Sequence, residues 1–113
     1  MEEKTIFEKI ISRDIPADIV FENDIAVVIR DINPQAPVHV LIIPKKRIDR
    51  IEMAQDGDAE LLGKLLIMAK DFARSYNLTG FRLVVNNGQQ AGETVPHLHI
   101  HLLSGRSMAW PPG

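Results

Sequence analysis

The stretch His97-Leu98-His99-Ile100-His101-Leu102-Leu103, close to the C-terminal end of the sequence, alternates histidine with large aliphatic residues. In a β-strand, successive side chains point to opposite faces. We therefore predict a strand over residues 97–103, in which the aliphatic side chains pack on a core and the three imidazoles line the other face. Any chemistry that the protein performs is expected on the imidazole face.

Four other segments are predicted to complete the same sheet. Each is a run rich in β-branched residues with Asn, Asp, Gly or Pro close to its ends. These segments are residues 19–22, 25–31, 38–43 and 81–86. Asn23-Asp24 separates the first two and predicts a hairpin, and the second run is apolar on both faces, which predicts an inner strand.

Two helices are predicted from a cap and from apolar spacing. Thr5 and Glu8 have the spacing of a capping box, so a short helix is expected to begin there and to end between residues 12 and 16. Apolar residues recur at helical spacing over residues 58–76, which predicts the main helix. Because short connections join neighbouring strands, the expected fold class is α+β, an antiparallel sheet of about five strands with one long and one short helix.

Length and composition predict a single domain over residues 1–113. The chain has no cysteine, which excludes disulfides and thiolate chemistry. A net charge of −2 argues against nucleic acid as a partner, since nucleic acid binding requires a basic face. The acidic N-terminus is not followed by an apolar segment, so we expect no membrane interaction and a cytoplasmic location.

Two loops contain groups suited to phosphate. The turn at residues 45–50 carries four basic side chains, and we interpret it as a solvated surface rather than as a site that steers phosphate. The loop before the histidines offers an amide, two flexible backbone positions and a hydroxyl from Asn86, Gly88, Gly92 and Thr94. Neither a Walker A sequence nor G-x-G-x-x-G is present, which excludes the two common phosphate-binding motifs.

Three hypotheses account for His97, His99 and His101. In the first hypothesis, the three histidines are simply the polar face of a half-exposed strand. The only other histidine, His39, also lies on a predicted strand, and chance does not readily account for this distribution of a rare residue. Alternatively they bind zinc, although residues 95–106 contain no Asp or Glu to orient a ligating ring. In the third hypothesis one imidazole attacks an electrophile while its neighbours fix its tautomer and move protons.

Residues 97–103 match the motif His-φ-His-φ-His-φ-φ, where φ is apolar, and the sequence resembles the histidine-triad (HIT) superfamily on this motif. Among its branches the sequence is most similar to the Hint branch, the histidine triad nucleotide-binding proteins. Other matching segments are Thr5-Ile6-Phe7, Asp31-Ile32, Pro34-Gln35-Ala36-Pro37-Val38-His39, Ile43-Pro44-Lys45-Lys46, Val84-Val85-Asn86 and Trp110-Pro111-Pro112-Gly113. The resemblance implies a HIT-like fold and makes the zinc hypothesis the second choice.

The resemblance implies a hydrolase, a purine nucleoside phosphoramidase that cleaves the phosphorus–nitrogen bond of adenosine 5′-phosphoramidates through a nucleotidyl-histidine, without cofactor or metal. By position, His99 would be the nucleophile, and His101 and His39 a relay that holds and polarises it. His97 would lie against the phosphate and the leaving group, and the Thr94 hydroxyl is a candidate for relaying a proton. The alternatives are a purine nucleotide-binding module with little catalysis and a dinucleoside polyphosphate hydrolase.

The resemblance also implies the substrate contacts. Asp31 would bind the ribose hydroxyls, and a C-terminal tail with Trp110 would reach the partner's active site in a homodimer joined through residues 58–76 and 81–86. The base would occupy an apolar slot made by Ile6, Phe7, Ile10, Ile29 and Ile32. The phosphate would contact Asn86, Gly92, Thr94 and Val95.

Two positions depart from the Hint pattern. Thr94 replaces the usual serine, which keeps the hydroxyl but restricts χ1. Pro96 stands where an aromatic residue is familiar, and it removes a backbone donor. Leaving-group preference and rate are the properties expected to be affected.

Overall fold

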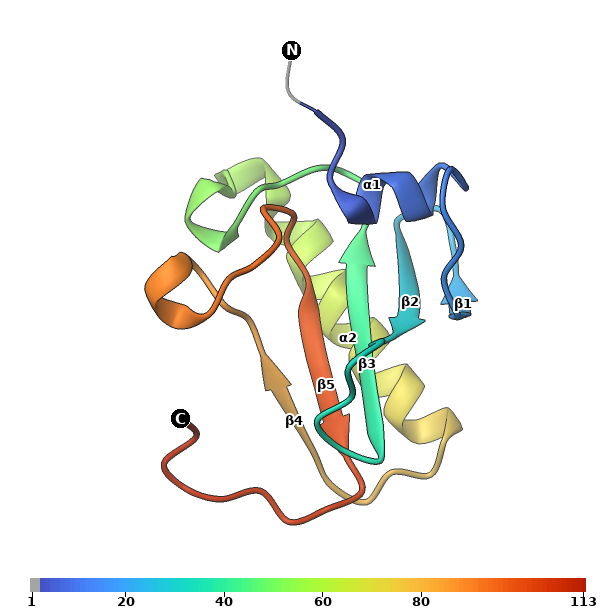
Figure 1. Ribbon diagram of the computed structural model, residues 1–113, viewed down its shortest axis with the longest axis vertical. Coiled ribbons are helices and arrows are strands. Elements are labelled where there is room, and N and C mark those ends of the chain that lie inside the picture. Colours follow the sequence, from blue (N-terminus) through green and yellow to red (C-terminus); the bar gives the residue numbers. More distant parts are fainter. Residues whose placement is uncertain (1–2) are drawn as a thin grey trace.

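The structure, a computed structural model, describes residues 3–113 and contains one five-stranded antiparallel sheet with a helix on each face (Figure 1). The strand order is β1-β2-β3-β5-β4, so β1 and β4 are the edges. The elements are α1 (Ile6–Ile11), β1 (Ile19–Glu22), β2 (Ala26–Arg30), β3 (Val38–Pro44), α2 (Ala59–Ser75), β4 (Phe81–Val84) and β5 (Ile100–Ser104). Three single-turn 3₁₀ helices, η1 (Ile51–Met53), η2 (Asp56–Asp58) and η3 (Gln89–Ala91), lie in the connections. The predicted α+β fold and the inner position of β2 are confirmed.

The main core lies between the sheet and α2. Ile42 of β3, Leu102 of β5 and Leu65 of α2 are 0 % exposed within it. Burying one aliphatic side chain of this size stabilises a fold by roughly 1.5–3 kcal/mol. A register slip of one residue would exchange the two faces of a strand, so this burial also keeps His39 and His101 on the other face. The predicted separation of aliphatic and imidazole side chains is thus confirmed for β5.

Helix α1 covers part of the imidazole face of the sheet. The Thr5 hydroxyl accepts the Glu8 N–H at 3.1 Å and the Glu8 carboxylate accepts the Thr5 N–H at 3.0 Å, which confirms the predicted capping box. The same helix buries Phe7 and Ile10 against β2 and β3. The cap therefore fixes where Phe7 meets the sheet.

Helix α2 has the predicted length within one residue at each end. Asp58 precedes it but does not cap it, because the Asp58 carboxylate accepts hydrogen bonds from the Gln55 N–H and from Lys46. Leu66 and Ile67 remain more than half exposed on this helix. Across residues 3–113, no helix combines the length and the apolar character needed to cross a membrane.

The strand predicted over residues 97–103 is shorter in the structure, because β5 begins at Ile100. Its partner β3 ends at Pro44, which has no N–H to continue the ladder. The Leu98 N–H instead donates to the carbonyl of Ile48 at 2.7 Å. His97 and His99 therefore lie in an irregular segment that leads into the strand, rather than in the strand itself.

Strand β4 is also shorter than predicted, since it ends at Val84 and residues 85–99 form a long connection to β5. Arg50 Nε and Nη2 both donate to the Glu93 carboxylate of this connection at 2.9 Å. Glu93 also accepts the Gly88 N–H at 2.9 Å, and its side chain is only 8 % exposed. Arg50 is thus a fixed structural cation, and the prediction of a solvated surface is wrong for this residue.

Replacing Glu93 by glutamine tests whether this ion pair holds the loop. The Arg50 guanidinium and the Gly88 N–H lower the pKa of Glu93 from 4.5 to about 2. Between these values the unfolded state binds more protons, so the ion pair's stabilisation is complete above pH 4.5 and is lost as the pH falls toward 2. Urea unfolding of Glu93→Gln at several pH values should show lower stability at pH 7 and a weaker pH dependence in this window.

Glu60→Gln is the matched control, because Glu60 is 83 % exposed and pairs with Lys64 on the surface of α2. That pair is expected to contribute less than about 0.5 kcal/mol. If Glu93→Gln loses stability between pH 4.5 and 2 as the wild type does, Glu93 is not the group that couples stability to pH.

Candidate active site

His99 presents one free ring nitrogen. Its Nδ1 lies 2.7 Å from the His97 carbonyl, and since a carbonyl only accepts, Nδ1 carries the proton. Nε2 then holds the lone pair, and no hydrogen bond within residues 3–113 involves it. Every buried side-chain nitrogen or oxygen in that range has a partner, so Nε2 is open to solvent. His99 thus offers an unprotonated nitrogen at the protein surface.

His39 and His101 form a hydrogen-bonded pair beside it. The Gln35 N–H donates to His39 Nδ1 at 3.0 Å, so the proton of a neutral His39 is on Nε2. His39 Nε2 lies 2.9 Å from His101 Nδ1, which accepts, and the proton of His101 is therefore on its own Nε2. The His101 ring lies 5.0 Å from the His99 ring, centroid to centroid. One backbone N–H thereby sets the tautomers of two imidazoles.

The relay pair is uncharged near neutral pH. Burial, together with the like charges of the neighbouring His99 and His39, lowers the pKa of His101 to about 4. Burial also lowers the pKa of His39, although Asp31 opposes this. Both rings therefore act as hydrogen-bonding groups rather than as cations.

His97 is 0 % exposed, and both its ring nitrogens are occupied. Nε2 donates to the Pro44 carbonyl at 2.9 Å. Nδ1 accepts a hydrogen bond from the Thr5 hydroxyl at 3.1 Å. The oxygen of that hydroxyl also accepts the Glu8 N–H. The predicted contact of His97 with phosphate and leaving group stays a prediction. In the structure, His97 holds the carbonyl that orients His99.

Phe7 fixes the two rings from the side of α1. Its ring meets the His99 ring edge-on at 4.9 Å between centroids, and the His97 ring at 5.9 Å. Sequence reasoning placed Phe7 in a slot for a base and assigned Thr5 only to the helix cap. The Thr5–His97 contact joins residues 92 positions apart and has no local sequence signal.

Asp31 lies at the end of the relay. Its Oδ2 is 3.4 Å from His39 Nε2, and its Oδ1 accepts the Asn33 N–H at 2.8 Å. Asp31, His39 and His101 hold ligand atoms within 4.8 Å of one another, the one such group among residues 3–113 that could bind a metal ion. A cation there would have to displace the proton between the two imidazoles. The absence of a metal stays a prediction.

The residues expected to form an apolar slot separate into two sets. Phe7, Ile10 and Ile29 are buried in one cluster, and Val95 packs against it. Ile6 is 46 % exposed and Ile32 is 96 % exposed. The structure therefore supplies an apolar floor with two exposed aliphatic side chains outside it.

The loop predicted to bind phosphate has glycines in backbone conformations that other residues rarely adopt. Gly88 and Gly92 have positive φ angles of 88° and 95°. The Asn86 side-chain nitrogen lies 4.0 Å from where a Cβ on Gly92 would stand. Thr94 is exposed at the end of this loop and lines a groove of about 360 Å³ with Ile6.

Trp110 is not brought to the histidines of its own chain. Residues 105–113 form neither helix nor strand, and this tail leaves β5 at the end of the sheet remote from α1 (Figure 1). The Trp110 side chain is 82 % exposed. Any contact between Trp110 and an active site would have to come from another copy of the chain.

Taken by its chemistry, the site can perform nucleophilic attack or accept a proton. An imidazole nitrogen with an available lone pair, a fixed tautomer and oriented neighbours has the arrangement of an activated nucleophile. The positive-φ glycines beside it supply backbone that can approach an anionic group closely.

Known proteins resemble this chain over nearly its whole length. A HIT-like protein of Synechocystis, slr1234, is 54 % identical over the full length of both chains. The adenylylsulfatase HINT1 of Arabidopsis thaliana is 48 % identical over 96 % of this chain and 76 % of its own. The crystal structure of a HIT family hydrolase from Legionella pneumophila superposes with a TM-score of 0.95 at 49 % identity, covering 97 % of this chain and 100 % of that one.

The family model of the HIT domain matches residues 12–108, a span that includes all four histidines. Together with the relatives above, this match confirms the resemblance on which the site residues were predicted. The chain belongs to the HIT domain family.

Proposed function

We propose that this protein is a hydrolase of adenosine 5′-phosphoramidates that works through a nucleotidyl intermediate on His99. The observation that carries the proposal is the 2.7 Å hydrogen bond from His99 Nδ1 to the His97 carbonyl, which leaves Nε2 available for attack. The hydrolase class is supported by relatives of known structure that are named HIT family hydrolases.

In the proposed first step, His99 Nε2 attacks the α-phosphorus. A phosphorus–nitrogen bond to His99 forms, the bond to the amine breaks, and the amine leaves with the electron pair and takes up a proton. The attacking ring becomes cationic, and the His97 carbonyl at Nδ1 stabilises that charge. We assign to the exposed Thr94 hydroxyl the relay of a proton from solvent water to the amine, so that the hydroxyl regains a proton as it gives one. His101 Nε2 would donate a hydrogen bond to a phosphoryl oxygen.

In the second step, water attacks the phosphorus and releases a proton to solvent, and the bond to His99 breaks. The electron pair of that bond returns to Nε2, which leaves AMP and His99 in its starting tautomer. The relay matters in both steps, since His39 and His101 remain neutral and can orient donors without adding positive charge. Donors that are fixed before the reaction stabilise the developing phosphoryl charge most effectively.

The nucleoside would lie beside the relay. Asp31 would accept hydrogen bonds from two ribose hydroxyls, because a carboxylate offers several acceptor positions, and its position beside His39 supports this role. Ile6 and Ile32 are the exposed side chains available to the base, above the buried Phe7, Ile10 and Ile29. Asn86, Gly92, Thr94 and Val95 would contact the phosphate.

Adenylyl sulfate is a second candidate substrate, because the Arabidopsis thaliana relative is named an adenylylsulfatase. The same attack by His99 would release sulfate in place of an amine. Sulfate leaves without a proton, so the two reactions place different demands on Thr94.

We further propose a homodimer. The support is the unpaired edge of β4 together with Leu66 and Ile67, which α2 leaves more than half exposed. In such a dimer the tail with Trp110 would reach the site of the partner. The purine ligand and the cytoplasmic location stay predictions.

His99→Ala tests the nucleophile. It should lower turnover of an adenosine phosphoramidate by at least about 1,000-fold, while AMP binding measured by calorimetry changes little. Acid quenching of the wild-type reaction should trap an adenylyl-protein that mass spectrometry locates on His99. Thr94→Ala is the comparison: it keeps the nucleophile and should still form the intermediate, but more slowly, because the amine lacks its proton relay.

Substantial residual turnover in His99→Ala would refute the assignment of the nucleophile. Normal wild-type turnover without a trapped adduct would indicate direct attack by water. AMP binding without turnover of the phosphoramidate, adenylyl sulfate or a dinucleoside polyphosphate would indicate a binding module.

Deleting residues 110–113 tests the role of the tail. The exposed Trp110 contributes little to the fold of its own chain, so the melting temperature and the dimer mass in sedimentation should stay unchanged. The ratio of kcat/KM values for several amine leaving groups should change. A monomeric wild-type protein, or an unchanged ratio, would contradict the proposal.

A further inference from the structure

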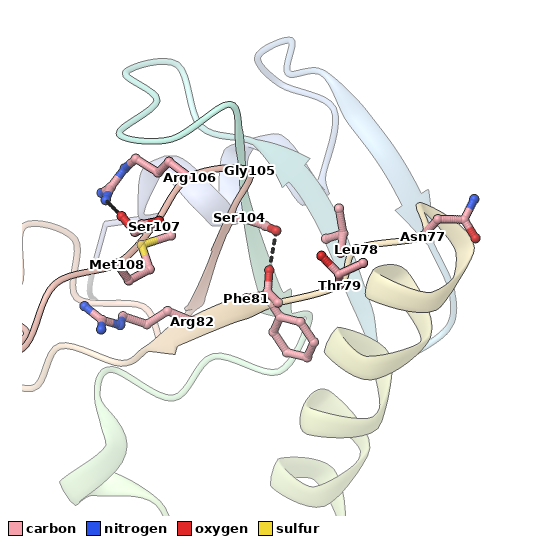
Figure 2. Close-up of a pocket in the computed structure, with 11 residues that line it drawn as sticks. Asn77, Leu78, Thr79, Phe81, Arg82, Ser104, Gly105, Arg106, Ser107 and Met108 are labelled. Atoms are coloured by element: carbon pink, nitrogen blue, oxygen red, sulfur yellow. Dashed lines mark hydrogen bonds between the residues drawn. The ribbon is translucent and has the colours of Figure 1, made fainter.

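A second groove lies at the opposite end of β5 from His99, where the connection from α2 to β4 meets the chain that follows β5 (Figure 2). Its volume of about 720 Å³ is within the range of small-molecule sites. Six residue steps from His99 to Gly105 place the two regions roughly 20 Å apart at about 3.3 Å per residue. The groove therefore does not belong to the site described above.

Two arginines give this groove its charge. Arg82 of β4 and Arg106, just after β5, both line it, and no Asp or Glu does. Neither guanidinium has an ion-pair partner within residues 3–113. Most other arginines of the described chain do, as with Arg30 to Asp18 and Arg50 to Glu93. In a chain of net charge −2, this acid-free pair is a local exception.

Both guanidiniums are held in place by neutral carbonyls. Arg82 Nη2 donates to the Ala109 carbonyl at 2.8 Å. Arg106 Nε and Nη1 donate to the carbonyls of Gln35 and Ser107, each at 3.0 Å. A guanidinium has five N–H donors, so each arginine keeps donors to spare while its orientation is fixed. Such preorganisation lowers the entropic cost of binding an anion.

The remaining lining divides the groove into a polar and an apolar side. Figure 2 shows Arg82, Arg106 and Ser107 on one side and Phe81 with Leu78 on the other. The Ser104 hydroxyl donates to the Gly80 carbonyl, and the Ser107 hydroxyl makes no hydrogen bond within residues 3–113. Phe81 is 41 % exposed, which leaves an aromatic surface for a ligand.

We propose that this groove is a binding site for a small organic phosphate. The phosphate group would lie between Arg82 and Arg106, because guanidinium forks match the geometry of phosphate oxygens. The organic part would lie on Phe81. The proposal is independent of the chemistry assigned to His99. It requires that the proposed dimer leave this groove open, because Phe81 and Arg82 lie on the β4 edge assigned to the interface.

The test is a titration of the ¹⁵N-labelled wild-type protein followed by NMR, with phenyl phosphate, inorganic phosphate and phenol as separate probes. Phenyl phosphate should shift the side-chain Nε–H signals of Arg82 and Arg106 in a saturable way. Inorganic phosphate should do so more weakly, and phenol should have no effect. The same phenyl phosphate titration of His99→Ala should give unchanged shifts at Arg82 and Arg106.

Arg82→Gln and Arg106→Gln should each weaken phenyl phosphate binding at least about 10-fold, the loss expected for a charge-assisted hydrogen bond. Arg82→Lys keeps the charge without the planar fork and should be intermediate. Arg74→Gln on α2 is the matched control and should bind as wild type. Preserved amide dispersion shows that each variant remains folded.

Three results would overturn the proposal. They are shifts confined to the residues around His99, wild-type affinity for phenyl phosphate in both glutamine variants, and no saturable shift with any probe. A dimer weakened by both glutamine variants, without phenyl phosphate binding, would assign the arginines to acidic side chains of a second copy instead.

Discussion

The hydrogen bond from His99 Nδ1 to the His97 carbonyl is the contact on which the proposed chemistry depends. It decides which nitrogen of His99 carries a proton and which carries a lone pair. The carbonyl is itself immobilised, because the His97 ring is buried and bonded at both nitrogens to Thr5 and Pro44. The exposed nitrogen of His99 is thus controlled by buried groups on the far side of the ring.

The end of β3 explains why this arrangement is possible. A proline without an N–H at position 44 stops the ladder, so the segment with His97 and His99 is released from strand geometry. The freed Pro44 carbonyl then accepts from His97. Farther along the same pair of strands the ladder is intact, and it brings His39 beside His101. One strand pair therefore supplies both the rigid relay and the irregular segment beside it.

Sequence patterns predicted the parts of this structure that depend on periodic burial. The alternation of Leu98, Ile100 and Leu102 placed those side chains in the core because exposure would forfeit their burial energy. The capping box at Thr5 and the apolar spacing of α2 were equally informative. The identity of the four histidines as a group came from the family resemblance rather than from periodicity.

Contacts made by backbone atoms or between distant side chains left no such pattern. The tautomers of His39 and His101 are set by the Gln35 N–H, and His97 is held by the Pro44 carbonyl. Every residue has a backbone carbonyl and every residue except proline has a backbone N–H, so the sequence does not mark the ones that matter. Glu93 and Arg50 pair across 43 positions, and either could have been a solvated charge. For the same reason the burial of His97 was not predicted, since it depends on Thr5 and Pro44 meeting the ring in space.

The tautomers of the four imidazoles test the central claim most directly. Long-range ¹H–¹⁵N correlation NMR of the labelled protein at pH 8 distinguishes a protonated from an unprotonated ring nitrogen. His99 is expected to carry its proton on Nδ1, whereas His39, His97 and His101 carry theirs on Nε2. A His99 protonated on Nε2 would remove the lone pair from the exposed nitrogen and contradict the account.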